Sequence, residues 1–280
     1  MSALPAAAGQ DEVVSPADVI AAAGLIRGQI IRTPTLPAPK LSQLTGADVV
    51  VKYENLQATG SFKDRGALVR LLSLSEEERR RGVVTVSAGN HGQALAWHAK
   101  RLGIAATIIM PTTTPYIKVG NTEMLGGRVV LHGETVSEAE EMAMALSRQG
   151  LTLVHPYDDV HVIAGQGTAG LECFEDAPDL DCLIVPIGGG GLASGVALAA
   201  KARRTGIELI GVQAAHYPSA YGAVKGVPVA CGGQTLAEGI AVKRPGRLTL
   251  PIIKEHFADI MLADEAFIER AVFAFMALQK

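Results

Sequence analysis

The residues best suited to chemistry lie in three short loops, each just before a predicted helix. In the first, from Glu54 to Gly66, polar and glycine residues surround Lys63. A lysine amine becomes a nucleophile when burial or nearby positive charge lowers its pKa, so Lys63 is a candidate Schiff-base lysine. The alternative is a surface lysine beside a helix cap at Ser61, because most lysines are exposed.

The second loop, from Val86 to Gly92, joins a predicted strand to a predicted helix. The free N–H groups of a helix start carry partial positive charge and stabilise a carboxylate or a phosphate. Ser87 and Asn90 add side-chain donors, so this loop predicts an anion site. The alternative is that these two side chains only cap the helix.

The third loop contains four consecutive glycines, Gly188 to Gly191, again between a strand and a helix. Glycine suits positions where the backbone comes close to a ligand, so the run indicates amides wrapped around a phosphate. Neither a Walker lysine nor the GxGxxG spacing with a downstream acid is present, which argues against the familiar nucleotide sites. A flexible turn is the alternative.

The remaining polar residues form no pattern of a known site. Three cysteines without CxxC spacing indicate neither a disulfide framework nor a zinc site, and they fit a reducing cytoplasm. The segment around Thr168 lacks the strand-to-helix context of a hydrolase elbow. We predict no metal site and a structural or surface role for the scattered histidines His98, His132, His155, His161, His216 and His256.

Composition narrows the class of protein that can hold these loops. The 280 residues are 48% hydrophobic and 19% charged, which allows a sizeable buried core. A net charge of -3 without a Lys/Arg-rich block predicts no nucleic acid partner and no anionic membrane surface. Pro186 and the glycines interrupt the long uncharged stretch 182–200, so we predict no membrane span.

Short β-branched runs alternate with helical patterns, which is typical of parallel sheets wrapped by helices. A helix should open at Ser15 as its N-cap and continue through Arg27. The predicted strands are 49–51, 83–86, 106–110, 128–131, 152–154, 183–185 and 209–212. Further helices are predicted over 66–74, 92–102, 136–149, 164–174, 192–202 and 263–280.

The sequence resembles the threonine/serine ammonia-lyases in three motifs and in their order along the chain: Ser61-Phe62-Lys63, the loop 87–92 and the tetraglycine loop. These are pyridoxal-phosphate enzymes of the tryptophan-synthase-β-like fold, known as fold type II. The resemblance runs from about Ile31 onward and includes the segments 54–57, 211–213 and 235–242.

The resemblance implies an α/β fold with two lobes, each a mostly parallel sheet with helices on both faces. It implies a large cofactor-binding domain over 15–75 and 154–280 and a small domain over 76–153. The Ala-rich start of the sequence, ahead of the predicted helix at Ser15, predicts a disordered tail over 1–14. Family members continue into further strands, so a truncated C-terminus of the large domain is expected.

The resemblance also assigns roles to residues. Lys63 would hold pyridoxal 5'-phosphate as a Schiff base and remove the α-proton of the substrate. Phe62 would pack beside the cofactor ring and Asn90 would bond its hydroxyl. Ser87, Asn90 and His91 would hold the substrate carboxylate. The cofactor phosphate would bind to Gly188, Gly189, Gly190 and Gly191.

The implied reaction is deamination of L-threonine, and of L-serine, to a 2-oxoacid and ammonia, in a homo-oligomer. Ala88 replaces the serine of the related racemases, which disfavours racemisation, and Gln213 replaces the acid that those relatives use for a metal. Asp64 is more typical of threonine synthases, although His91 is not. A β-replacing enzyme of that kind and a catalytically impaired cofactor-binding subunit remain the alternatives.

Overall fold

The computed structural model describes residues 13–203 and 206–279, so of the predicted tail over 1–14 only Val13 and Val14 fall within it. The chain divides into two compact units. Unit 1 comprises residues 1–31 and 55–166, and unit 2 comprises residues 32–54 and 167–280. These boundaries differ from the predicted small domain over 76–153, and that division stays a prediction.

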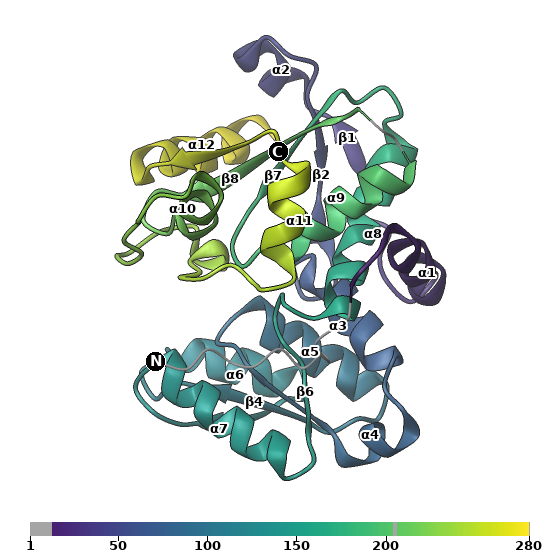
Figure 1. The fold of residues 1–280 in the computed structure, drawn as a ribbon, viewed down its shortest axis with the longest axis vertical. Coiled ribbons are helices and arrows are strands. Elements are labelled where there is room, and N and C mark those ends of the chain that lie inside the picture. The colour runs from purple at the N-terminus through teal and green to yellow at the C-terminus, as the bar shows by residue number, and fades with distance from the viewer. Residues whose placement is uncertain (1–12, 204–205, 280) are drawn as a thin grey trace. The chain divides into compact units, whose positions relative to one another are not determined.

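Unit 1 is built on a parallel four-stranded sheet in the order β5-β4-β3-β6. Figure 1 labels β4 and β6 of this sheet. The helices of unit 1 begin with α1, which starts at the predicted N-cap: Ser15 and Asp18 form a capping box. The strands are β3 (Val83–Val86), β4 (Ala106–Met110), β5 (Arg128–Leu131) and β6 (Thr152–Leu153). The helices are α1 (Pro16–Ile26), α3 (Lys63–Leu72), α4 (Glu76–Arg81), α5 (Asn90–Arg101), α6 (Tyr116–Met124), α7 (Val136–Arg148) and the start of α8 (Val160–Asp176).

Helices cover both faces of this sheet. Successive strand residues point to opposite faces. Ile108 of β4 packs in one buried cluster with Leu95 of α5, whereas its neighbour Ile109 packs in another with Ala139 of α7. The sheet of unit 1 is therefore doubly wound, as the alternation of elements predicted.

Unit 2 contains a parallel sheet in the order β7-β8-β9 and a separate antiparallel pair, β1 with β2. The antiparallel pair departs from the parallel arrangement expected of the run 49–51. The strands are β1 (Thr35–Pro37), β2 (Val50–Lys52), β7 (Cys182–Pro186), β8 (Glu208–Ala214) and β9 (Asp259–Ala263). The helices are α2 (Pro39–Thr45), the rest of α8, α9 (Gly191–Arg203), α10 (Ser219–Lys225), α11 (Thr249–His256) and α12 (Glu265–Leu278).

All seven predicted strands and all seven predicted helices are present, with ends that shift by a few residues. The sequence did not predict β1, β9, α2, α4, α6, α10 and α11. Helix α4 shows the reason, because its sequence EEERRR has no apolar periodicity and its ends are set by a capping box at Ser75 and by Gly82. In the described part, no helix combines the length and hydropathy that crossing a membrane requires.

Candidate active site

Lys63 is the first residue of α3, at the junction of loop and helix where the sequence predicted it. Its Nζ donates a hydrogen bond to the carbonyl oxygen of Pro156 at 2.6 Å and lies 5.3 Å from the centre of the Phe62 ring. Burial disfavours the charged ammonium and lowers the pKa of Lys63 from 10.5 to about 8. About a tenth of the amine is therefore uncharged and nucleophilic at pH 7, far more than for an ordinary lysine.

The loop before α5 leaves its backbone donors available. Gly89 is the N-cap of α5, and no side chain caps this helix start. The Ser87 hydroxyl instead accepts a hydrogen bond from the Gly89 N–H at 3.3 Å, and Asn90 is exposed as the first helical residue. The first N–H groups of a helix have no intrahelical partner, so this start retains the donors that an anion needs.

The side chain of His91 is buried at 3% exposure, and its Nε2 lies 3.3 Å from the carbonyl oxygen of Val154. Burial, and then the positive charge of Lys63, lowers the pKa of His91 to about 3, so the ring is neutral. A carbonyl only accepts, so Nε2 carries the hydrogen and Nδ1 is an acceptor. Such a ring cannot donate to a carboxylate through Nδ1, which leaves the backbone N–H of His91 as the donor for the predicted role.

Two residues near Lys63 were not predicted to contribute to the site. One is Pro156, whose carbonyl accepts the Lys63 hydrogen bond. The other is His155, whose ring is buried and whose Nδ1 accepts a hydrogen bond from the Asp158 N–H at 2.8 Å. Burial lowers the pKa of His155 to about 4, although nearby carboxylates oppose this effect. The available signal was topological: β6 ends just before His155, and the C-terminal ends of neighbouring parallel strands form the sites of such sheets.

The glycine loop of unit 2 is packed in place. Gly190 has φ +98°, and a Cβ there would meet Thr249 Oγ1 at 2.7 Å and the Ile253 side chain at 2.8 Å. The Thr249 hydroxyl donates to the Gly189 carbonyl at 2.7 Å, and the Gly246 N–H donates to the same oxygen at 3.0 Å. These contacts do not fit a flexible turn, and the loop leads directly into the free amides at the start of α9.

Gln213, which ends the strand β8 with Ala214, supports this loop. Its side-chain Nε2 donates to the Ile187 carbonyl at 3.2 Å, and its Oε1 accepts the Tyr221 N–H at 2.8 Å. Both ends of the amide are therefore used within unit 2. Among residues 13–203 and 206–279, no group of three His, Cys, Asp or Glu side chains could hold a metal ion, and the absence of a metal stays a prediction.

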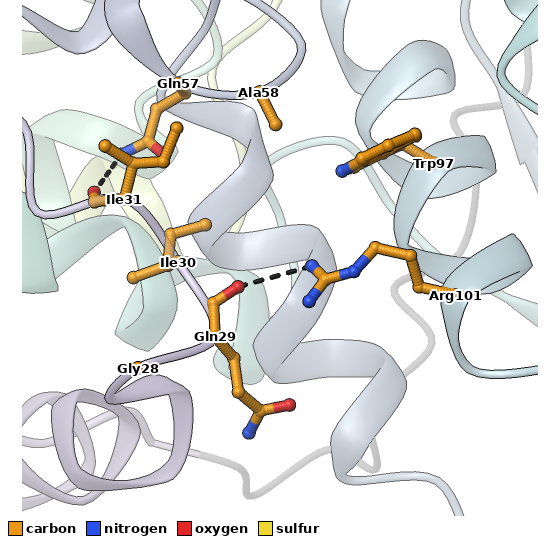
Figure 2. Close-up of a pocket in the computed structure, with 8 residues that line it drawn as sticks. All are labelled: Gly28, Gln29, Ile30, Ile31, Gln57, Ala58, Trp97 and Arg101. Carbon is orange, nitrogen blue, oxygen red and sulfur yellow. Dashed lines mark hydrogen bonds between the residues drawn. The ribbon is translucent and has the colours of Figure 1, made fainter.

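A cavity of about 380 Å³ lies elsewhere in unit 1 (Figure 2). None of its lining residues was predicted as a site residue. The buried indole Nε1 of Trp97 has no hydrogen-bond partner in the described part of the chain. The lining residues are Gly28, Gln29, Ile30, Ile31, Gln57, Ala58, Trp97 and Arg101.

The predicted site residues are divided between the units: Phe62, Lys63, Ser87, Asn90 and His91 belong to unit 1, and Gly188 to Gly191 belong to unit 2. Each set fits one part of pyridoxal phosphate. A buried amine with a pKa of about 8 suits its aldehyde. A glycine loop with no room for a Cβ at Gly190, followed by a helix start, suits its phosphate.

Curated relatives are similar over most of the chain. An L-threonine ammonia-lyase of Thermotoga maritima is 44% identical over 258 residues, which are 91% of this chain and 64% of that protein. The catabolic L-threonine dehydratase TdcB of Staphylococcus aureus (strain N315) is 41% identical over 264 residues, 93% of this chain and 76% of that protein. The chain thus spans slightly less than two thirds of the Thermotoga protein.

Solved structures are similar as well. The processed form of threonine deaminase isoform 2 from Solanum lycopersicum superposes with a TM-score of 0.82 at 35% identity, covering 93% of this chain and 77% of that one. Serine racemase from Dictyostelium discoideum superposes with a TM-score of 0.88 at 35% identity, covering 95% of this chain and 86% of that one. A family model described as pyridoxal-phosphate dependent enzyme matches residues 26–278. The predicted resemblance is confirmed, and the chain belongs to the family of pyridoxal-phosphate-dependent enzymes.

Proposed function

We propose that this chain deaminates L-threonine, and also L-serine, to a 2-oxoacid and ammonia by eliminating the β-hydroxyl group. The 44% identity to an L-threonine ammonia-lyase over 91% of the chain supports the reaction. The observation that carries the assignment to a site is the Lys63 amine, which is held by the Pro156 carbonyl and has a pKa of about 8.

The roles of the chain's own residues follow from their geometry. The uncharged Lys63 amine accepts the α-proton of the substrate at Nζ. The first N–H groups of α5, including that of His91, bind the substrate carboxylate, with Ser87 and Asn90 beside them. The His91 ring is neutral, so it places no second positive charge near the Lys63 amine. When bound, pyridoxal phosphate supplies an electron-withdrawing ring that stabilises negative charge at the α-carbon.

The glycine loop would bind the cofactor phosphate through backbone amides at the start of α9. The hydrogen bonds of Gly189 and Ile187 to Thr249 and Gln213 support this role, because they fix the loop before any ligand binds. A loop fixed in advance loses less conformational freedom on binding.

Product analysis tests the proposed reaction. L-Threonine with the 280-residue chain and pyridoxal phosphate should give 2-oxobutanoate and ammonia in equal amounts, and L-serine should give pyruvate. The matched control is Lys63→Ala, which should form neither product. Release of phosphate from phosphohomoserine without deamination of threonine would instead support the threonine synthase alternative. Retention of the cofactor with no turnover of either compound would support an impaired binding subunit.

We further propose that the protein acts as a homo-oligomer, as the resemblance implies, and that it is cytoplasmic, as its three cysteines without CxxC spacing favour. Sedimentation of the purified chain tests the assembly, and a single monomeric species at micromolar concentration would contradict it.

A further inference from the structure

The residue that follows Lys63 is an aspartate with no exposed surface. Asp64 is 0% exposed, and its Oδ2 accepts the Thr59 N–H at 2.9 Å while its Oδ1 accepts the Thr59 hydroxyl at 3.0 Å. Aspartates are almost never fully buried unless they are paired. This carboxylate therefore ties the loop before Lys63 to the first turn of the helix that carries Lys63.

The partner of Asp64 on the neighbouring helix α5 is His98, which is 1% exposed. Its Nε2 lies 3.1 Å from Asp64 Oδ1, and its Nδ1 lies 3.1 Å from the Arg101 guanidinium. A guanidinium can only donate, so Nδ1 accepts and Nε2 carries the hydrogen that is donated to Asp64. The three side chains thus form one directed chain of hydrogen bonds, from a cation through the imidazole to a carboxylate.

The outer end of this chain is also fixed. Arg101 donates to the backbone carbonyl of Gln29 at 3.3 Å, a contact drawn as a dashed line in Figure 2. Helices α3 and α5 pack against each other along the same stretch. The chain therefore runs from the segment after α1, through α5, to the residue beside Lys63.

We infer that Asp64, His98 and Arg101, here named the Asp64 chain, position Lys63 by holding the first turn of α3 and the preceding loop against α5. Its functional meaning rests on the proposed role of Lys63. Asp64 and His98 touch no reacting atom in this account; they act through the backbone of residue 63. The sequence motif around Lys63 does not contain His98, which is 35 residues away from it.

The pKa of the Lys63 amine reports on this positioning. If the first turn of α3 loosens, Nζ leaves the Pro156 carbonyl and becomes hydrated, and its pKa rises towards 10.5. The nearest titrating side chains do not obscure this change. His91 and His155 have pKa values of about 3 and about 4, so neither changes charge between pH 7 and 10.

Two substitutions of His98 separate positioning from bulk stability. Glutamine places its amide nitrogen near the Nε2 position and keeps the donor to Asp64, whereas asparagine reaches only the Nδ1 position and loses it. Leu95→Ala is the matched control, because Leu95 is a buried residue of the same helix with no part in the Asp64 chain. Arg101→Met removes the guanidinium that donates to His98 Nδ1, and position 101 is exposed. This variant replaces His98→Asn in the experiment if His98→Asn does not fold.

The experiment measures the pH midpoint of Lys63 acetylation by acetic anhydride in the full 280-residue chain, by mass spectrometry, without cofactor or substrate. We expect a midpoint near 8 for the wild type and Leu95→Ala. His98→Gln should raise it by no more than Arg101→Met does, because glutamine keeps the donor to Asp64 and loses only the acceptor for Arg101. His98→Asn should raise it by at least about one unit, which is a tenfold loss of free amine at pH 7. Arg101→Met should raise it by less.

Unchanged midpoints in both His98→Asn and Arg101→Met would overturn the inference. An equal rise in Leu95→Ala would also overturn it, because the effect would then be general destabilisation. Threonine turnover is measured separately on the wild type. A wild type without turnover but with the expected midpoints would contradict the proposed function and leave the Asp64 chain supported.

Discussion

Substitution of Gly190 by alanine tests whether the glycine loop is shaped by its packing. The residue has φ +98°, and the left-handed region costs an L-residue about 1–2 kcal/mol. The new Cβ would also meet Thr249 Oγ1 at 2.7 Å and Ile253 Cδ1 at 2.8 Å, and overpacking of this kind costs about 1–3 kcal/mol. We therefore expect Gly190→Ala to lower the free energy of unfolding by about 2–5 kcal/mol.

Gly226→Ala is the matched control in the same unit. Gly226 has φ +70°, but no heavy atom lies within 4 Å of its added Cβ, so only the backbone cost of about 1–2 kcal/mol applies. The assay is urea denaturation followed by circular dichroism, together with titration of pyridoxal phosphate. Gly190→Ala should also weaken cofactor binding by tenfold or more, and Gly226→Ala should not. Equal losses of stability and affinity in the two variants would refute the steric argument for this loop.

Three further variants test the charges and caps described above. Folding lowers the pKa of His91 from its ordinary 6.5 to about 3, so the unfolded state binds the proton first as the pH falls. Between pH 7 and pH 5, the free energy of unfolding of the wild type should therefore fall by about 2 kcal/mol more than that of His91→Leu. Lys52→Met removes the mostly buried ion pair between Lys52 Nζ and Glu172, which are 2.6 Å apart, and should lower the free energy of unfolding by about 3 kcal/mol. The control Lys201→Met removes an exposed ion pair and should lower it by less than about 1 kcal/mol, both measured by urea denaturation. Ser15→Ala removes the capping box of α1 and should cost about 1 kcal/mol, and no measurable change would contradict that cap.

Much of the fold follows from local sequence patterns. Continuous β-branched and apolar runs predict β3 and β4, because both strands are buried in the centre of a parallel sheet. The Ser15 cap predicts where α1 begins. Strand β9 was missed because Ile260 is its only β-branched residue, and its neighbouring Met261 and Leu262 are both exposed, so buried and exposed residues do not alternate. Its pairing with β8 depends on residues about fifty positions earlier in the chain.

Some residues of the candidate site could be predicted from the sequence, and others could not. Lys63, Ser87 and the four glycines stand in recognisable motifs, because loops between strands and helices are short and local. Motifs in the sequence could not reveal the Pro156 carbonyl, because a backbone oxygen has no sequence signal. They could not reveal His98 either, because it contacts Asp64 only through the packing of α3 on α5. His91 offers its backbone N–H for a different reason, because its ring is hydrogen-bonded to the carbonyl oxygen of Val154, just after β6.

The most direct test of the central claim is the identity of the lysine that reacts with the cofactor. The chain is incubated with pyridoxal phosphate, reduced with borohydride, digested and analysed by mass spectrometry, with Lys63→Ala treated in parallel. We expect stoichiometric modification at Lys63 and loss of the visible cofactor absorbance in the variant, because this amine has a pKa of about 8. Modification spread over exposed lysines such as Lys40 and Lys100, with equal yield in Lys63→Ala, would contradict it.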